Sequence, residues 1–478
     1  MNEHDSYVNP LNSRYASAEM SHLFSDNHRY YLWRKLWLVL AQSEQKLGLN
    51  ITNEQLKEMS EHLEDIDYDV VASLERKLKH DVMAHIHAFG VVAPHAFPII
   101  HLGATSCYVT DNAEIMMMKE ALELIKTKVL NVINNLTSLA SKYSNLPTLG
   151  LTHLQPAQLT TVGKRFTLYI QDLMLDLNDL DLVINQMKLR GATGATGTQA
   201  SFLDLFDQDV EKVNKLQDLI VKSLGYSGAY DVTGQTYPRK IDYNVTVVLS
   251  KIAQSASKFA NDLRLLQSKK EMEEPIGDDQ VGSSAMAYKR NPMLCERICS
   301  LSRYVESLPI NCAFTASTQW FERTLDDSAN KRIVIPQAFL ALDGILDVYY
   351  YVTSKITIYP KIIAKHINEE LPFMATENII MEMVKCGYSR QDVHEKIRTL
   401  SRIAAVNVKE LGMDNNLISL IRNDPFFTPI LSQMDSILNP TKYVGMAPLQ
   451  TMKYIDNVVN PILNQYKNVL NLQVKIEL

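Results

Sequence analysis

Glycine is scarce in this sequence. It accounts for 17 of 478 residues, below 4%, where ~7% is usual in globular proteins, and proline is also slightly low at 17. Both residues interrupt helices, so their scarcity over so long a chain favours long, uninterrupted helices. The chain is roughly three times the ~150 residues of a typical domain. We therefore expect several domains that are rich in helix.

Cysteine is sparse as well. The five cysteines are an odd number and form no CxxC pair, which is typical of reduced intracellular thiols and not of a disulfide framework. Residues 1–15 are polar and lack the apolar core of a signal peptide. The longest uncharged stretch, residues 88–110, contains two prolines and two histidines, which does not predict a membrane span. We expect a cytoplasmic protein that does not contact a membrane.

Neither sign of charge dominates. The chain has 48 basic and 54 acidic residues, a formal net charge of −6. This balance argues against a nucleic-acid partner, because proteins that bind nucleic acids usually carry a basic face. A small anionic ligand remains possible, because its pocket needs only a few cations.

Standard cofactor and metal motifs are also missing. The sequence contains no GxxxxGK[ST], no GxGxxG that follows a strand pattern, and no HExxH. His80, His85 and His87 could in principle hold zinc, but on a helix His80 and His87 share a face that excludes His85. A catalytic or hydrogen-bonding histidine is the favoured interpretation, and we predict no metal site.

Long segments without glycine or proline mark the middle of the chain. In residues 111–145 apolar side chains recur at helical spacing, with Thr110 or Asp111 as the expected cap and Pro147 just beyond the end. Together with four further segments this predicts roughly five long helices. The others lie between Pro156 and Gly191, at 239–274, at 293–308 and around 337–354.

This pattern predicts an all-α fold of three domains. They are an N-terminal helical domain (1–110), a central long-helix bundle (111–359) that carries a loop at 277–292, and a C-terminal helical domain (360–478). Helices of this length bury too little against one another within a single chain. We therefore expect the bundle to associate with copies of itself in a homo-oligomer.

Residues 282–292 form the most informative local motif. After Gly282, two serines make a sterically open loop, two cations and an amide follow, and Pro292 leads into a helix. In this arrangement a hydroxyl can approach a substrate while Lys289 and Asn291 stabilise developing negative charge. An exposed polar turn before a helix has a similar composition, so composition alone leaves both interpretations open.

The pattern GSSxMxxKxN in this loop resembles the signature loop of the fumarase/aspartase superfamily, whose members eliminate fumarate from a succinyl group. Members share a long central helical bundle in a homotetramer, with active sites built from several subunits, and the resemblance implies the same here. Further segments narrow the resemblance to the adenylosuccinate lyase family, from about residue 10 to at least residue 400. These segments are 13–17 (SRYAS), 79–85 (KHDVMAH), 103–106 (GATS), 152–158 (THLQPAQ), 233–237 (TGQTY), 322–332 (ERTLDDSANKR) and 389–392 (SRQD).

The resemblance implies a β-elimination that needs no cofactor. Adenylosuccinate would give AMP and fumarate, and the succinyl-aminoimidazole-carboxamide ribotide (SAICAR) would give AICAR. A proton next to a carboxylate is weakly acidic, so its removal needs a positioned base and cations that hold the dianionic intermediate. Ser283 matches the family's base, Lys289 would stabilise the deprotonated serine, and His153 matches the general acid. His80 resembles a second functional histidine that orients the succinyl group or the acid.

Other matched positions would hold the substrate. Hydroxyl and amide side chains would bind the fumarate half, and arginines would supply the forked donors that a phosphate needs. By resemblance, the substrate-binding residues are Arg14, Tyr15, Lys79, Asp81, Thr105, Ser106, Gln235, Asn291, Arg297, Arg323, Ser328 and Arg332.

Two alternatives differ from this interpretation. A sister lyase acting on argininosuccinate, malate or aspartate would keep the serine loop but need no phosphate site, and segments 13–17 and 322–332 speak against it. A non-catalytic helical scaffold from the same superfamily would be supported by a damaged Ser283, Lys289 or His153, and all three are intact.

One position departs from the family's pattern. Ala287 stands where the family commonly has proline, directly after the methionine of the loop. Alanine removes a fixed φ angle and restores an N–H group, which predicts a less pre-organised loop with its activity retained.

Overall fold

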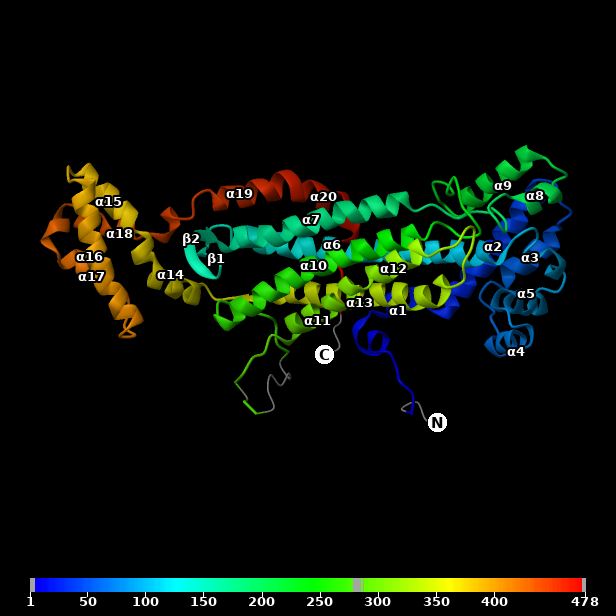
Figure 1. Ribbon diagram of the computed structural model, residues 1–478, viewed down its shortest axis with the longest axis horizontal. Coiled ribbons are helices and arrows are strands. Elements are labelled where there is room, and N and C mark those ends of the chain that lie inside the picture. Colours follow the sequence, from blue (N-terminus) through cyan, green and yellow to red (C-terminus); the bar gives the residue numbers. More distant parts are fainter. Residues whose placement is uncertain (1–4, 278–284, 287, 475–478) are drawn as a thin grey trace.

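The structure is a computed structural model that describes residues 5–277, 285, 286 and 288–474. Long helices run side by side along the molecule and form an elongated bundle, with smaller helical parts at both ends (Figure 1). The predicted all-α class is confirmed. The bundle consists of α6 (Ser106–Lys142), α7 (Val162–Gln186), α10 (Lys240–Ser268), α11 (Met293–Ser307) and α13 (Asp327–Lys355).

These five helices match the five long segments expected from the sequence, and they pack on one another. α10 lies against α7, α11 and α13, and α6 lies against α7 and α13. Their facing sides are apolar: α6 buries residues such as Ile115, Leu122 and Val129 at the seven-residue spacing that keeps side chains on one face. The bundle is therefore held together mainly by burial of apolar surface.

Two helices begin earlier than the sequence predicts. α6 starts at Ser106 after Thr105, and Asp111, one of the two expected caps, lies inside the helix and is buried in an ion pair. α13 starts at Asp327 and contains Pro336, which cannot donate to the carbonyl of Arg332 one turn earlier. Packing of the flanking turns outweighs that lost hydrogen bond, so a single proline does not mark the start of this helix.

Shorter helices form the N-terminal part. The core contains Trp33, Trp37 and Phe89, and it is continuous with the core of the bundle. Its helices are α1 (Ala18–Leu23), α2 (Asp26–Lys46), α3 (Asn53–Glu61), α4 (Tyr68–Leu78) and α5 (Asp81–Val92), and α8 (Ala200–Leu205) and α9 (Val210–Ser223) lie at the same end (Figure 1).

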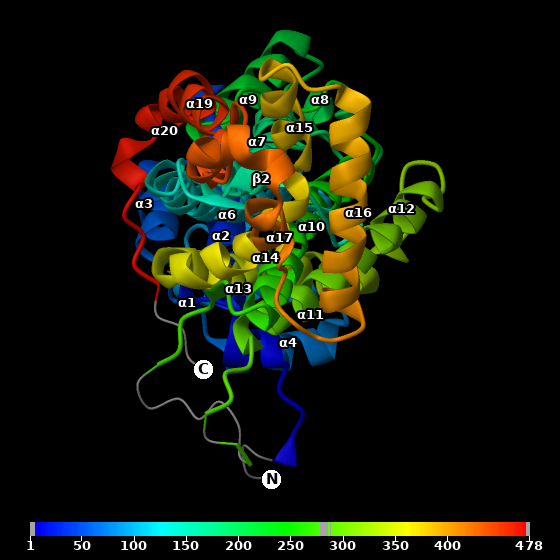
Figure 2. The same cartoon turned by 90° about the vertical axis from the view of Figure 1, so that its left-hand side faces the viewer.

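The C-terminal part has a hydrophobic core of its own, which lies between Ala375 and Ile437. Figure 2 shows its helices in front of the bundle, and the chain then returns along α7. The boundaries predicted at residues 110 and 359 stay a prediction. The helices are α14 (Pro360–Met374), α15 (Thr376–Lys385), α16 (Arg390–Lys409), α17 (Leu417–Asn423), α18 (Met434–Ile437), α19 (Ala447–Tyr454) and α20 (Asn460–Gln465), with α12 (Pro309–Ser317) beside the bundle.

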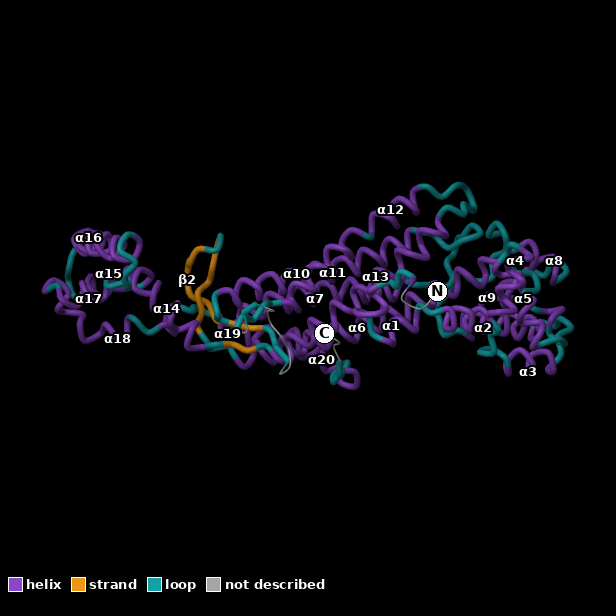
Figure 3. Tube along the Cα trace, turned by 90° about the horizontal axis from the view of Figure 1, so that it is seen from below, coloured by secondary structure: helices purple, strands orange, loops and turns teal. Residues whose placement is uncertain are grey.

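Two small antiparallel sheets interrupt the helices, and the sequence pattern did not predict them. A hairpin of β1 (Pro147–Thr152) and β2 (Gln155–Thr161) joins α6 to α7. A second pair, β3 (Met272–Glu273) and β4 (Thr357–Ile358), ties the end of α10 to the chain that leads into α14. Figure 3 shows the hairpin extending from the bundle at the end nearest the C-terminal part.

One helix of the described residues, α13, is long and apolar enough to cross a membrane. Of its most apolar window, 72% is buried inside the protein. Burial to this degree is typical of a helix at the centre of a bundle.

Candidate active site

A cleft of about 540 Å³ collects much of the predicted site. Its walls come from the junction of α4 and α5, the first turns of α6, the segment around Gln235 and the start of α13. Thr105, the residue before Ser106, occupies the N-cap position of α6 without a side-chain cap hydrogen bond. Eight predicted residues line this cleft: Lys79, His80, Asp81, Ser106, Gln235, Arg323, Ser328 and Arg332.

His80 is fixed by its place at the start of α5. Lys79 ends α4 in the left-handed conformation (φ 55°), and the sharp change of direction places His80 as the N-cap of α5. Its Nδ1 accepts a hydrogen bond from the backbone N–H of Met83 at 3.4 Å. In the tautomer that lets Nδ1 accept, the ring N–H is on Nε2, which lies 3.5 Å from Ser106 Oγ. The cap thus aims the N–H of the imidazole into the cleft.

Arg323 and Gln235 meet at a buried thiol. Arg323 Nη1 donates to Cys107 Sγ at 3.1 Å, and the same sulfur lies 3.7 Å from Gln235 Oε1. Burial raises the pKa of Cys107 to about 11, so the group is a neutral thiol at physiological pH. The side-chain amide of Gln235 also donates a hydrogen bond to the carbonyl of Ala195 at 3.2 Å, which holds it in place. The cleft therefore presents a positioned guanidinium and a positioned amide.

Buried charges support the floor of this cleft. Arg239 pairs with Asp111 at 3.1 Å and with Asp327 at 2.7 Å, and all three side chains are almost fully buried. Burial alone would raise the pKa of Asp111, but the cations of Arg239 and Lys331 lower it overall. The network joins α6, which begins with Ser106, to the starts of α10 and α13, which follow the segments that carry Gln235 and Arg323. At the rim, Arg332 pairs with Asp81 at 3.2 Å.

Arg14, Tyr15 and Arg297 lie in a second cleft of about 460 Å³. The guanidinium of Arg297 lies over the ring of Tyr15, 5.4 Å from its centroid. The N-terminal segment can lie close to α13 because residue 344 is glycine: a Cβ there would lie 2.7 Å from the carbonyl oxygen of Tyr15. Two arginines and a tyrosine hydroxyl in one cleft match the donors that a phosphate needs.

His153 lies apart from both clefts. It occupies the tight turn of the hairpin, where both His153 (φ 55°) and Leu154 (φ 58°) are left-handed, and its side chain is exposed. The hairpin and α5 lie at opposite ends of the bundle (Figures 1 and 3). One copy of the chain therefore does not bring His153 and His80 together.

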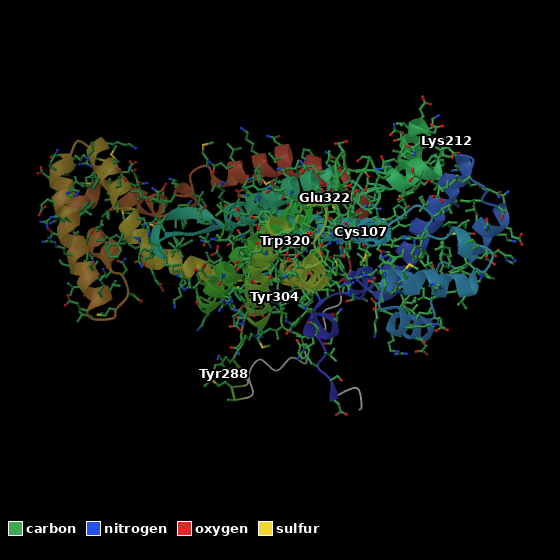
Figure 4. The ribbon with its side chains drawn as sticks, turned by 45° about the vertical axis from the view of Figure 1, so that its right-hand side comes forward. Cys107, Lys212, Tyr288, Tyr304, Trp320 and Glu322 are labelled. Carbon is green, nitrogen blue, oxygen red and sulfur yellow. The ribbon has the colours of Figure 1, made fainter. Side chains whose placement is uncertain are left out.

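The signature loop is described only in part. Ser283, the predicted base, and Ala287 lie outside the described residues. Lys289 and Asn291 are described on the segment that leads into α11, with Lys289 exposed and Asn291 half-buried. Figure 4 shows Tyr288 standing well away from the body of the protein, while Cys107 lies within it.

Several residues of the first cleft were not predicted from the sequence. Cys107 directly follows the matched segment 103–106 and Arg239 lies two residues after another, so proximity to the motifs was a usable signal. Arg29 and Glu75 also line the cleft, but they lie outside every matched segment. Their participation follows only from the way α2 and α4 pack.

Comparison with known proteins identifies the family of this chain. A lyase family model matches residues 17–306, and a model of the adenylosuccinate lyase C-terminus matches residues 372–454. The adenylosuccinate lyases of Schizosaccharomyces pombe and Saccharomyces cerevisiae are each 51% identical to the chain, over 100% of both sequences. The chain belongs to the adenylosuccinate lyase family. As a member of this family it is a carbon–nitrogen lyase.

Similar adenylosuccinate lyases are also found outside the fungi. A solved structure has the same fold. The adenylosuccinate lyase of Schistosoma mansoni is 44% identical over 100% of both chains. The 3-carboxy-cis,cis-muconate lactonizing enzyme from Pseudomonas putida has a TM-score of 0.79 at 20% identity, covering 96% of this chain and 100% of its own. At such low identity the likeness shows the shared fold alone.

Proposed function

We propose that the chain cleaves adenylosuccinate to AMP and fumarate, and SAICAR to AICAR and fumarate, in purine nucleotide biosynthesis. The observation that carries the proposal is the cleft that brings His80, Ser106 and Arg323 together, in a chain half identical to enzymes named for this reaction.

The proposed mechanism moves two protons and stabilises the negative charge that develops on the succinyl group. Ser283 would take a proton from the succinyl carbon, and the electron pair would form the double bond of fumarate as the carbon–nitrogen bond breaks. His153 would give a proton to the departing purine nitrogen. Negative charge develops on the succinyl carboxylate before cleavage, and Lys289 and Asn291 would stabilise it. No step needs a metal or a cofactor.

The proposed substrate carries carboxylates at its succinyl end and a phosphate at its nucleotide end, and the predicted residues can bind both kinds of group. Ser106, Gln235 and Thr105 offer the hydroxyl and amide groups that bind a carboxylate. Arg14, Tyr15 and Arg297 in one cleft, and Arg323, Ser328 and Arg332 in the other, supply donors for a phosphate. A sister lyase without a phosphate on its substrate would have no use for so many arginines.

We further propose that the enzyme is a homotetramer whose active sites draw residues from several subunits. Within a single chain, α5, which begins after His80, and the hairpin whose turn holds His153 lie at opposite ends of the bundle. An apolar stripe on α7, formed by Leu168, Leu175 and Leu182 at a spacing of seven residues, is more than half exposed in one copy. Such a stripe is suited to packing against a second helix. For the location of the enzyme we propose the cytosol.

An absorbance assay tests the proposed reaction. Purified protein is mixed with adenylosuccinate, with SAICAR and, as a matched control, with argininosuccinate, which has the succinyl group but no phosphate. We expect release of fumarate from the first two and none from the third. Release from argininosuccinate alone would contradict the proposal.

A further inference from the structure

Two stems of the signature loop meet at the C-terminal end of α10. The first stem is β3 with Glu274, and the second runs through Arg290 into α11. Polar side chains connect the two stems, although polar groups in a protein interior are costly unless they are paired. The hydrogen-bond partners of these side chains therefore indicate which role the side chains have in the loop.

Glu274 caps α11 from the opposite stem. One of its carboxylate oxygens accepts from the N–H of Leu294 and the other from the N–H of Cys295, each at 2.9 Å. Pro292, the N-cap residue of α11, makes no side-chain cap hydrogen bond, so this carboxylate meets the first backbone donors of the helix. Glu274 is only 3% exposed.

Gln267 bridges the two stems with its side-chain amide, which is a neutral group. Its Oε1 accepts from the backbone N–H of Glu274 at 3.1 Å, and its Nε2 donates to the carbonyl of Arg290 at 3.2 Å. The side chain is 7% exposed. A single buried amide thus uses its donor on one stem and its acceptor on the other.

Glu273 holds the side chain of the same arginine. Its Oε2 accepts from Arg290 Nη1 at 3.1 Å and from the hydroxyl of Tyr359 at 2.8 Å. Arg290 is therefore held at its carbonyl by Gln267 and at its guanidinium by Glu273. Its two chain neighbours are Lys289 and Asn291, the two described residues of the loop that are predicted to act on the substrate.

We infer that Gln267, Glu273 and Glu274 are positioning residues for Lys289 and Asn291. This inference rests on the proposed function. Among the described residues, none of the three lines either of the two clefts, so they act through the stem and not on the substrate. A displacement of only about 1 Å in a group that stabilises developing charge can reduce a rate by up to about a hundredfold.

The inference is tested with Gln267→Leu and Glu274→Gln. Leucine removes both bridging hydrogen bonds, and glutamine leaves a single acceptor for two N–H groups. Glu271→Gln is the matched control, because Glu271 is equally buried on the same segment but its carboxylate pairs with His366 at 2.7 Å and not with the second stem.

We expect both test variants to lower kcat about tenfold or more, with KM for adenylosuccinate changed less than about threefold, while the control keeps its kcat. A merely structural role would reduce the amount of active enzyme in all three variants in proportion to their loss of Tm. Unchanged kcat in the test variants, or an equal loss in Glu271→Gln, would overturn the inference.

Hydrogen exchange gives a readout that does not depend on activity. In Glu274→Gln the amides of Leu294 and Cys295 should exchange faster than in the wild type, while those in the middle of α11 stay protected. If the wild type released no fumarate, the proposed function would fail and the exchange data would still decide whether Glu274 fixes this stem. Equal exchange in the two proteins would refute the positioning role.

Discussion

Glu44 lies inside α2 with its carboxyl group fully buried, and neither carboxylate oxygen has a hydrogen-bond partner among the described residues. Burial raises the pKa of Glu44 to about 9 from an ordinary value of 4.5. The group is therefore a neutral acid in the folded protein at physiological pH. In the unfolded chain the same carboxyl would be ionised.

The pH dependence of stability follows from this difference. Between pH 4.5 and 9 folding takes up a proton at Glu44, so stability is lost as the pH rises through this window. Glu44→Gln removes the titration and keeps the shape. We expect its Tm to exceed that of the wild type by about 2–4 °C at pH 8 and by less at pH 6.

Scanning calorimetry at the two pH values measures this difference. Glu61→Gln, at an exposed position of α3, serves as the control and should show no change with pH in its Tm relative to the wild type. A gain for Glu44→Gln that is equal at pH 6 and pH 8 would contradict the linkage.

Three motifs predicted residues that the structure brings close together. The segments around His80, Ser106 and Arg323 placed these residues in one site, and the structure brings them to one cleft. Glu44 carries no such signal, because a glutamate in a helical pattern normally faces water. Its burial depends on what packs against α2, which a single sequence does not reveal.

At the scale of elements, the ion-pair network of Arg239 is the main polar connection between three long helices. Asp111 belongs to α6, Asp327 to α13, and Arg239 is the N-cap residue of α10. Sequence periodicity predicted these helices, but it could not show that a charged residue in each would be buried against the others. Periodicity likewise did not show that Asp111, expected as a cap, would lie inside α6 and pair with Arg239.

Arg239→Gln should strongly destabilise the fold. It leaves the carboxylates of Asp111 and Asp327 buried without their cation, and breaking a buried pair in this way costs about 3–5 kcal/mol. The measurement is the midpoint of urea unfolding followed by circular dichroism. The midpoint should fall clearly below that of the wild type.

A surface ion pair supplies the comparison. Lys251 and Asp179 lie 2.6 Å apart, but both side chains are nearly half exposed. Lys251→Gln should therefore cost less than about 1 kcal/mol. Similar midpoints for Arg239→Gln and Lys251→Gln would show that the buried network contributes no more than a surface pair.

At the scale of the whole molecule, one copy of the chain keeps the predicted catalytic and binding residues apart. The residues predicted to act together lie in two clefts and on a distant hairpin turn. The resemblance predicted a site shared between subunits, and the long bundle with the leucine stripe of α7 is suited to such an assembly. The hairpin itself was not predicted, because its strands are short and lie between two strong helical patterns.

The leucine stripe gives a direct test of assembly. Leu175→Glu places a charge in the middle of the stripe, and burying that charge between subunits would be costly. We expect smaller species in analytical ultracentrifugation and loss of activity. Leu411→Glu, at a leucine 62% exposed near the end of α16 and far from the bundle, should leave both unchanged. A Leu175→Glu protein that keeps the size of the wild type would exclude the stripe from the interface.

The central claim is that this lyase builds each active site from His80 of one subunit and His153 of another. The most direct measurement mixes two inactive variants, His80→Ala and His153→Ala, under conditions that exchange subunits, and follows fumarate release from adenylosuccinate. Random mixing should restore up to about a quarter of the wild-type activity, because half of the chains supply each intact residue. No recovery, although labelled subunits demonstrably exchange, would contradict the account.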